Sequence, residues 1–532
     1  MANTHQAKLV KNAAGRFVPT IVNGIPAVPF KGLGKYRPDR FMAAPPIRSC
    51  TEYPSDGNKL VKTLKEALKK SGLKSGMTIS THHHLRDGDG LTCVLFDTIK
   101  EMGVKNIRWF PSASFPCHEY LIKYLEDGTI HHIEGSMNGP LGRYASEGKM
   151  KGMGVLRSHG GRYRAIQDGE VHIDIAVIAA PCADSFGNAN GVAGKSACGP
   201  LGFALGDSEY AERVIVVTDT LMDFPCIPWH IQGNNVDYVV EVDSLGDPSK
   251  IVSGTTQVTK SPDRILIARY IAQFVEESGI MQNGFSFQAG AGGINLAFLV
   301  LLKERMKSQG IKARFIRGGS TQYLTEMLEE GLTDYILDGQ AFDAEGIRSL
   351  RENPRHVPTS PFTSYNFHGK GNFASMLDVV VLGATEVDIK FNANVVTHSD
   401  GLLLHGIGGW QDCLFGKCVI LAIPSFRDRV PIIVDRVTTL CGPGEMIDVV
   451  ITERGIAINP LRQDLNKKLS SSSLPIRKLE DIQREVDEIC GGKPELPKVT
   501  KDNVVAVVQW VDGTLLDSVY ATIPEYLKSI PR

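Results

Sequence analysis

The chain has 532 residues and a formal net charge of −1, with 42% hydrophobic and 22% charged residues. This length exceeds one hydrophobic core, so we expect about two to four globular domains. The small charge excludes a global field for nucleic acid, and no apolar window reaches the roughly 20 residues that would span a membrane. Residues 1–16 have no apolar signal-peptide core and the ten cysteines have no paired spacing, which predicts a cytoplasmic protein with reduced thiols.

The first half of the chain shows the pattern of a parallel sheet. Residues 1–55 are rich in Gly, Pro and Arg without clear periodicity, and we predict an extended arm there. The elements predicted next are a helix over 59–71, a strand over 77–81, a helix over 91–102 and a strand over 107–110. Strand, loop, helix and strand in this order indicate a first α/β domain over 56–247.

The second half repeats these events after a Ser/Thr/Lys-rich linker at 248–262. The elements predicted are a helix over 264–278, a strand over 285–288, a glycine loop, a helix over 294–307 and a strand over 313–316. They indicate a second α/β domain over 263–465. A C-terminal extension over 466–532 is predicted to hold a charged helix (478–489) and a hairpin that turns at Asp512-Gly513.

An internal repeat supports two similar domains. Residues 173–190 and 377–394 align so that Asp174, Asp184 and Asn188-Ala189-Asn190 recur as Asp378, Asp388 and Asn392-Ala393-Asn394. The predicted fold class is therefore α/β, with two similar, open, mostly parallel sheets. Two similar domains usually place one site in the cleft between them.

Two glycine-rich segments are candidate anion or oxyanion sites. Gly290, Gly292 and Gly293 lie between a strand and a helix, where main-chain N–H groups and the helix dipole can hold an anion; a tight turn without a ligand is the alternative. Gly406, Gly408 and Gly409 follow an apolar strand, and their N–H groups can converge as an oxyanion hole. A bend without function is the alternative there.

Two further groups of polar residues stand out. The repeated Asp and Asn residues are predicted to form a structural corner in each half, but Glu386 has no acidic counterpart in the first half and is the more interesting carboxylate. The run His82-His83-His84 replaces the glycine loop in the first half. No Cys or carboxylate spacing completes a ligand set around it, so we predict no metal and keep ligand contact or a structural role open.

Four ordered motifs of the second half resemble the family I coenzyme A transferases. They are the glycine loop at 290–293, Glu386-Val387-Asp388 leading to Asn394, the bend from Gly406 to Asp412, and Ile451-Thr452-Glu453-Arg454-Gly455-Ile456-Ala457. Within this superfamily the loop His-His-His-Leu-Arg-Asp-Gly-Asp that begins at His82, the long N-terminal arm and the total length are similar to the alpha subunits of citrate lyase.

This resemblance implies an activity and partners. Citrate would replace acetate on the thioester of an acyl carrier protein, so that acetyl-carrier and citrate give citryl-carrier and acetate. A beta (lyase) subunit would then cleave citryl-carrier, and the gamma (acyl carrier) subunit would bear the coenzyme A-like prosthetic group. The chain would need no cofactor of its own, coenzyme A thioesters could substitute, and the protein would form an oligomer without contacting nucleic acid or membranes.

The sequence departs from the family at the nucleophile. Acetate-type members place a Glu at the end of the strand after the glycine helix, and alignment by strand ends puts Gln322 there. An alternative register restores Glu326, but the repeat of Leu121 and Leu125 as Leu324 and Leu328 favours a helix at that point. An amide forms no acyl anhydride, so the resemblance implies direct attack by citrate in a ternary complex.

The candidate roles follow from this route. Gly408 and Gly409 would stabilise the oxyanion, Gln322 would orient a carboxylate, and Arg317, Arg86 and His84 would neutralise citrate. The alternatives are a coenzyme A transferase or acyl-CoA hydrolase with a covalent glutamyl thioester on Glu326, and a non-catalytic scaffold or ligand-binding subunit. A nucleotide-sugar or isomerase role does not explain the glycine bend.

Overall fold

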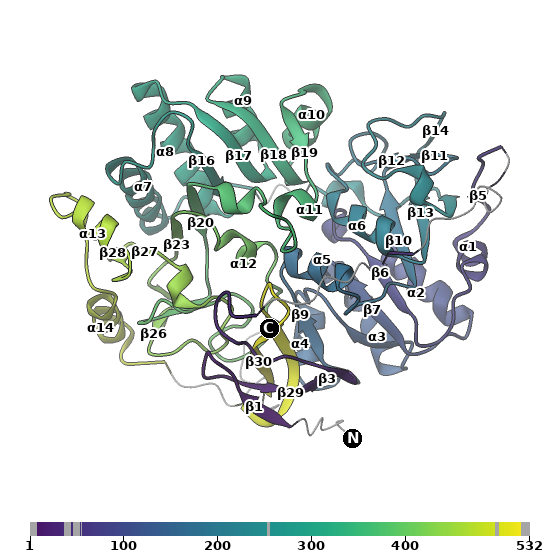
Figure 1. The fold of residues 1–532 in the computed structure, drawn as a ribbon, viewed down its shortest axis with the longest axis horizontal. Helices are drawn as coiled ribbons and strands as arrows, with labels where there is room; N and C mark the ends of the chain where they lie inside the picture. Colours follow the sequence, from purple (N-terminus) through teal and green to yellow (C-terminus); the bar gives the residue numbers. More distant parts are fainter. Residues whose placement is uncertain are drawn as a thin grey trace.

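The computed structural model describes residues 8–36, 44–45, 54, 56–252, 256–494 and 499–522. The remaining parts of the predicted arm, linker and C-terminal extension lie outside the described residues. Two large sheets, one from each half of the chain, stand side by side with helices packed around them (Figure 1). This arrangement confirms the predicted fold class, two open and mostly parallel α/β units.

The first sheet contains seven strands, and all its paired neighbours are parallel. Its order is β5 (Leu60–Val61), β15 (Tyr238–Glu241), β13 (Arg213–Thr218), β10 (Ile175–Ala180), β6 (Thr78–Thr81), β7 (Ile107–Pro111) and β8 (Ile130–Ile133). All six residues of the central strand β10 are buried. A parallel strand covered on both faces reads as a continuous apolar run, which is why its position was evident from the sequence.

The second sheet repeats this topology around β20. Its order is β19 (His356–Pro358), β18 (Thr333–Ala341), β17 (Ala313–Ser320), β16 (Ser286–Ala289), β20 (Val379–Leu382), β23 (Val419–Ala422), β27 (Val449–Thr452) and β28 (Gly455–Ile458). All its pairs are parallel except β27 with β28. Strands β6, β10 and β13 of the first half therefore correspond to β16, β20 and β23.

The helices connect and cover these strands. In the first half they are α1 (Leu64–Lys70), α2 (Leu91–Glu101), α3 (Ile122–Glu126), α4 (Pro140–Ser146), α5 (His159–Gln167) and α6 (Gly202–Tyr210). In the rest of the chain they are α7 (Pro262–Glu277), α8 (Gly293–Gln309), α9 (Gln322–Glu329), α10 (Ala344–Glu352), α11 (Pro361–Ser364), α12 (Trp410–Cys413), α13 (Gln463–Lys468) and α14 (Leu479–Cys490).

The predicted helix over 59–71 is wrong at its start. Leu60 and Val61 form the edge strand β5, which pairs with β15. Helix α1 begins only after Thr63, whose side chain accepts a hydrogen bond from the Glu66 N–H as its N-cap. The sequence pattern could not separate the two, because an edge strand of two residues has no periodicity of its own.

The repeated aspartates have the same structural role in both halves. Asp174 accepts a hydrogen bond from the Thr78 N–H at 2.7 Å, and Asp378 accepts one from the Ser286 N–H at 2.9 Å. Small sheets form the corners: β11 (Cys182–Asp184) with β12 (Ala189–Asn190) and β14 (Leu221–Met222), and β21 (Glu386–Asp388) with β22 (Ala393–Asn394) and β26 (Ile433–Val434). The internal repeat therefore encodes strand connections rather than chemistry.

A third sheet joins the two ends of the chain to the first half. Strands β29 (Val499–Gln509) and β30 (Leu515–Thr522) form the hairpin, and β29 also pairs in parallel with β9 (Gly154–Leu156). The arm forms two separate two-stranded sheets, β1 (Leu9–Lys11) with β2 (Phe17–Pro19) and β3 (Ile21–Val22) with β4 (Ile25–Pro26), which lie beside the hairpin in Figure 1. Asn12 fastens the arm by donating to the carbonyl oxygens of Leu515 and Leu516 at 2.9 and 2.7 Å.

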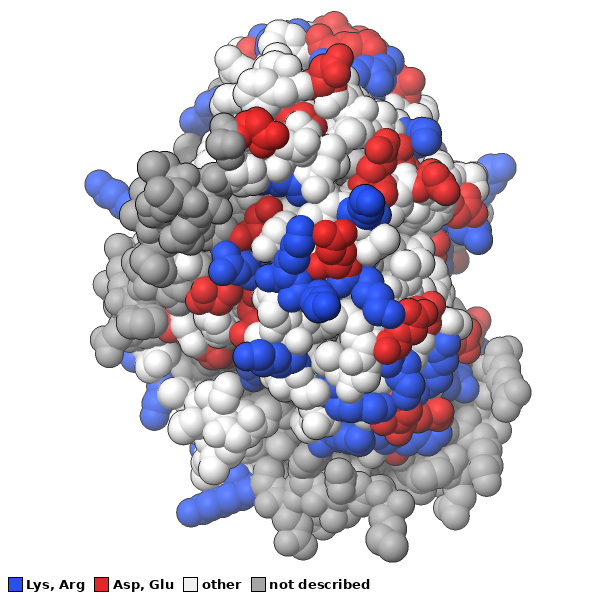
Figure 2. Space-filling view, turned by 90° about the vertical axis from the view of Figure 1, so that its right-hand side faces the viewer, with Lys and Arg blue, Asp and Glu red and all other residues white. Residues whose placement is uncertain are grey.

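The outer face around α1 and α2 carries charges of both signs. Figure 2 shows Lys and Arg side chains interleaved with Asp and Glu. Ion pairs near these helices include Lys65 with Glu101 (3.3 Å) and Lys105 with Asp127 (3.3 Å). This face therefore presents no single-sign surface. Among the described residues, no helix has the length and apolar character needed to cross a membrane.

Candidate functional site

A cavity of about 250 Å³ lies between the two halves. The first half contributes His159 at the start of α5 and Phe203 on α6. The second half contributes the ends of β16, β17 and β18, the segment 360–365 and the glycine bend at 407–413. Because β16, β17 and β18 are parallel, their carboxyl ends open at one edge, the usual place for a ligand in such a sheet.

Strand β17 is longer than the sequence indicates, and this decides which residues reach the cavity. The predicted strand ends at 316, whereas β17 continues to Ser320, whose N–H and Oγ donate to Asp338 on β18 at 3.1 and 2.7 Å. Gly318 has a φ of +138°, and a Cβ on Gly319 would lie 1.6 Å from the Phe342 ring. Both glycines permit the close approach of β17 to β18, although their sequence reads as a loop.

Arg317 is the charged group of the cavity. Its side chain is 1% exposed, and its guanidinium lies over the Tyr365 ring at 3.9 Å. Burial opposes its charge, but nearby Tyr365 and Cys413 hold the pKa of Arg317 above its ordinary value. Within the described residues its Nε lacks a hydrogen-bond partner. A buried guanidinium with an unsatisfied donor beside a cavity is a site for an anion.

Gln288 is a second unsatisfied group, which the sequence analysis missed. It lies near the end of β16, lines the cavity, and its Oε1 is buried without a hydrogen-bond partner in the described part of the chain. Its amide can accept from a hydroxyl or donate to a carboxylate. The only signal in the sequence was its place directly before the glycine loop, at the carboxyl end of a predicted strand.

The two glycine segments meet the cavity unequally. Gly290 lines it, whereas Gly292 is exposed and Gly293 begins α8, and neither of these two lines it. Gly409 lines the cavity between Ile407 and Trp410. The sequence therefore found both segments but could not single out the residues that face the cavity.

The other two glycines of the bend dock it on the first half. The Gly406 N–H donates to Ser136 Oγ at 2.7 Å, and the Gly408 carbonyl oxygen accepts from the His159 N–H at 2.9 Å. Gly408 does not line the cavity, and its parallel bridge with Ser158 pairs its main chain with the first half. The Gly409 N–H has no acceptor among the described residues and remains available to a ligand.

Asp412 holds the bend against the start of α5. Its Oδ1 accepts from Ser158 Oγ at 2.9 Å, and its Oδ2 accepts from the Gly160 N–H at 3.1 Å. Burial raises the pKa of Asp412 to about 7, even though these two hydrogen bonds favour the ionised form. The carboxyl group is thus a buried tie between the halves that changes charge near neutral pH.

We expect this tie to weaken the fold as the pH rises. An unfolded Asp titrates near about 4, so between that value and about 7 the native state holds the Asp412 proton more tightly than the unfolded chain. This contribution to the free energy of unfolding is complete below the unfolded pKa of about 4. It decreases by at most about 1.4 kcal/mol per pH unit and is lost once the pH has risen through the folded pKa of about 7. Urea unfolding at pH 5 and pH 8 should show wild type losing stability relative to Asp412→Asn; parallel pH dependence of the two proteins would contradict this.

His84 and Arg86 do not line this cavity. His84 is buried, and its Nε2 lies 2.6 Å from the Ala179 carbonyl oxygen; burial and neighbouring His82 lower the pKa of His84 to about 4. Arg86 lies over the Phe342 ring at 4.1 Å and donates to the Ala341 carbonyl oxygen. Phe342 lines the cavity. Arg86 therefore packs against a residue of the cavity wall without lining the cavity itself.

Glu386 and Asn394 also lie outside this cavity. They face each other across β21 and β22, where Asn394 Nδ2 donates to Glu386 Oε2 at 3.0 Å. Glu386 further accepts from the N–H and Oγ1 of Thr438 at 2.7 and 3.0 Å. These bonds satisfy a buried carboxylate within a corner, so the placement supports a structural rather than a catalytic role.

Gln322 and Glu326 point to solvent from α9. Gln322 is the first residue of this helix, and its N–H donates to Asp343 Oδ2 at 2.8 Å. Glu326 is exposed and pairs with Lys303 at 3.0 Å. Neither lines the cavity. Alignment by strand ends put Gln322 at the nucleophile's place, but β17 ends at Ser320 and Gln322 is the exposed first residue of α9.

We therefore expect both residues to be dispensable for acyl transfer. Gln322→Ala and Glu326→Gln should keep kcat/KM within about twofold of wild type, since exposed ion pairs contribute about 0–1 kcal/mol to stability and no reacting group lies near them. Steady-state exchange assays on the purified variants measure this. A loss of tenfold or more in Glu326→Gln would instead revive a glutamyl intermediate.

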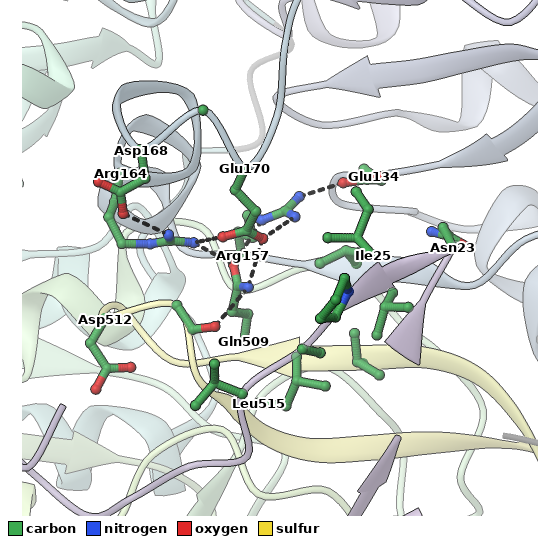
Figure 3. A pocket seen from close by; sticks show the side chains of 18 of the residues that line it. Asn23, Ile25, Glu134, Arg157, Arg164, Asp168, Glu170, Gln509, Asp512 and Leu515 are labelled. Atoms are coloured by element: carbon green, nitrogen blue, oxygen red, sulfur yellow. Dashed lines mark hydrogen bonds and ion pairs between the residues drawn. The ribbon is translucent and has the colours of Figure 1, made fainter. Parts of the chain in front are cut away.

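A second cavity, of about 330 Å³, lies where the hairpin, the arm and the first half meet (Figure 3). Arg157 binds Glu134 at 2.7 Å and Glu170 at 2.8 Å, and Gln509 of the hairpin binds both Arg157 and Glu170. Burial opposes ionisation, but Arg164 and Arg157 lower the pKa of Glu170 to about 2. Since these charges satisfy one another, the network fastens the hairpin and is not a candidate for catalysis.

Two similar parallel-sheet halves around a cavity with a buried cation and a free main-chain donor fit a transferase of the coenzyme A transferase type. Residues 57–522 match the family described as "Citrate lyase, alpha subunit (CitF)". The chain belongs to this family, and it is an enzyme with the family's activity, a citrate CoA-transferase.

Individual relatives agree with this assignment. The citrate lyase alpha chain of Klebsiella pneumoniae is 41% identical over 461 residues, covering 86% of this chain and 90% of that protein. A citrate lyase alpha subunit from Streptococcus mutans, solved in complex with citrate, has a TM-score of 0.90 at 39% identity and covers 96% of this chain and 100% of its own. The alpha subunit of a malonate decarboxylase from Acinetobacter baumannii shares the fold, with a TM-score of 0.57 at 16% identity over 81% of this chain and 92% of its own.

Proposed function

We propose that this chain exchanges the acetyl group of an acyl carrier thioester for a citryl group, with release of acetate. The observation that carries the proposal is Arg317, a buried guanidinium with an unsatisfied donor at a cavity between the halves. Citrate is a trianion near neutral pH and needs such a cation. The citrate found in the related Streptococcus mutans structure supports the same substrate.

The cavity favours direct attack by the substrate. No Asp or Glu side chain is among its described lining residues, so the protein offers no carboxylate to carry the acyl group. A citrate carboxylate oxygen would attack the thioester carbonyl carbon, and the C–S bond would break to give a mixed anhydride and a thiolate. The thiolate would then attack the citryl carbonyl carbon, break its bond to the bridging oxygen and release acetate.

Three groups of this chain would assist both steps. Arg317 would hold a citrate carboxylate by charge-assisted hydrogen bonds, and Gln288 Oε1 would accept a bond from the citrate hydroxyl group. The N–H group of Gly409 would stabilise the negative charge that develops on the carbonyl oxygen. Holding both acyl partners in one cavity would also replace a bimolecular encounter by an intramolecular one.

Steady-state kinetics test the route. With acetyl-coenzyme A or acetyl-carrier and citrate varied together, double-reciprocal plots should intersect, because both substrates bind before any product leaves. Borohydride added after the thioester should leave the activity unchanged, since no enzyme-bound thioester exists to be reduced. Parallel lines together with borohydride inactivation would establish the covalent alternative.

The proposed function includes partners. The acyl group would arrive on the coenzyme A-like prosthetic group of an acyl carrier (gamma) subunit and leave for a lyase (beta) subunit, while this chain binds no cofactor of its own. Family membership supports a multi-subunit complex. Native mass spectrometry of the chain mixed with both subunits should show one assembly containing all three; three separate species would contradict it.

A further inference from the structure

The ring of His159 projects into the cavity from the first half, and neither the repeat nor any motif indicated it. His159 is the first residue of α5, which Ser158 caps by accepting a hydrogen bond from the Gly161 N–H at 2.9 Å. Three rings hold the imidazole: His83 stacks on it at 5.6 Å and 8°, Phe203 lies at 4.4 Å, and Tyr365 lies at 6.1 Å. Its orientation is therefore set by packing.

The ring nitrogens of His159 have no assigned partner. No hydrogen bond joins either of them to another residue in the part of the chain that the structure describes. Burial, together with Arg317 and Arg162, lowers the pKa of His159 to about 3. The imidazole is therefore uncharged at neutral pH and keeps one N–H to donate.

The imidazole meets the glycine bend of the second half. His159 Nε2 lies 3.8 Å from the position that a Cβ on Gly408, which has a φ of +62°, would occupy. The Gly408 carbonyl oxygen accepts a hydrogen bond from the main-chain N–H of His159. His159 of the first half and Gly409, the next residue of the bend, both line the cavity, so a side chain of one half and the main chain of the other converge there. Asp412 fixes this contact through Ser158 and Gly160.

We propose that His159 is a catalytic residue that completes the oxyanion hole, with its Nε2–H donating to the thioester carbonyl oxygen beside the N–H group of Gly409. The inference rests on the proposed transfer reaction. When the carboxylate oxygen bonds to the carbonyl carbon, the C=O electron pair moves onto oxygen, and these donors stabilise it until the C–S bond breaks and the thiolate leaves. The imidazole neither gains nor loses a proton.

Other roles for His159 fit the geometry less well. A carboxylate nucleophile is already ionised, so the reaction needs no general base. A base would also require a pKa near the working pH, which the partly buried, Arg317-flanked ring does not have. An uncharged imidazole that polarises a carbonyl is an established way of using such a group.

Three variants test the assignment. In acetyl-coenzyme A plus citrate assays, His159→Ala should lower kcat about 10²–10³-fold, the usual effect of losing one oxyanion donor, while the citrate dissociation constant from calorimetry stays within about twofold. His159→Asn should recover about tenfold over the Ala variant, because its amide can donate from a similar position. His172→Ala, at a half-exposed histidine of the same half, should match wild type.

The outcomes separate the two proposals. Wild-type protein without citrate-dependent exchange would overturn the proposed function itself. Active wild type with an equally active His159→Ala would overturn only the role of His159. Equal activity losses in the Ala and Asn variants, together with lost citrate binding, would assign His159 to packing and also overturn its catalytic role.

Chemical modification tests the same contact without a mutation. Diethyl pyrocarbonate acylates uncharged imidazoles, and peptide mass mapping can follow His159 and His172 in one experiment. Saturating citrate and acetyl-coenzyme A together should slow the modification of His159 at least about fivefold, because bound substrates shield the ring. The modification rate of His172 should not change. Equal modification of His159 with and without both substrates would overturn the contact.

Discussion

Gly409→Ala should abolish most acyl transfer, with kcat/KM at least about 10²-fold lower. A Cβ on Gly409 would lie 2.4 Å from Tyr365 Oη and 2.9 Å from Cζ, so the ring must move. That ring supports the Arg317 guanidinium at 3.9 Å, and the main-chain donors of the bend would move with it. A single methyl group would thus disturb the cation and the oxyanion donors together. Steady-state exchange with acetyl-coenzyme A and citrate measures the loss.

A matched glycine variant controls this experiment. Gly371→Ala adds the same methyl group where a Cβ would meet nothing within 4 Å, and it should retain wild-type kinetics. Circular dichroism and urea unfolding should show both variants folded. A folded but inactive Gly409→Ala would also argue against a purely scaffolding subunit, whereas an active one would remove the glycine bend from the mechanism.

Arg317→Met should lower kcat/KM for citrate by about 10–10²-fold. A hydrogen bond to a charged group contributes about 1.5–3 kcal/mol, and Arg317 is the arginine among the described residues that line the cavity. The kcat/KM of Arg317→Lys should fall between those of wild type and Arg317→Met. An ammonium keeps the charge but loses the planar fork and the stacking on Tyr365. Citrate titrations at fixed acetyl-coenzyme A give the values.

Stability measurements separate binding from folding in this case. Removal of a buried cation without a carboxylate partner relieves desolvation, so the urea midpoint of Arg317→Met should not fall below that of wild type. Arg351→Met, at a half-exposed arginine of α10, serves as the matched control and should leave citrate kinetics unchanged. Wild-type citrate kinetics in Arg317→Met would contradict the proposed carboxylate site.

Much of the fold could be predicted because local sequence patterns determine it. The apolar runs of β10 and β20 and the repeated aspartates mark equivalent strands in both halves, and each aspartate caps the neighbouring strand in the same way. The helix predicted over 294–307 agrees with α8. Arg317 and the bend at Gly409 were also found, because a cation at a strand end and clustered glycines are visible in one segment.

The errors have one physical source, which is pairing between strands distant in sequence. Strand β17 continues past Gly318 and Gly319 because β18 supplies hydrogen-bond partners for Ser320. The residues of β17 alone do not indicate this extension. Gln322 lies just beyond the end of β17, on the exposed surface at the start of α9. Glu386 was singled out for lacking a counterpart, yet Thr438 and Asn394 satisfy it inside a corner.

The sequence by itself determined the two-domain α/β plan, the family and the glycine-rich bend, because strand periodicity, an internal repeat and ordered motifs are properties of contiguous segments. Only the tertiary structure decided which residues face one cavity. His159, Gln288 and Tyr365 belong to separate segments and meet there only when the two halves pack together. Convergence of this kind depends on strand length and inter-half contacts such as Asp412 with Ser158, which no single segment encodes.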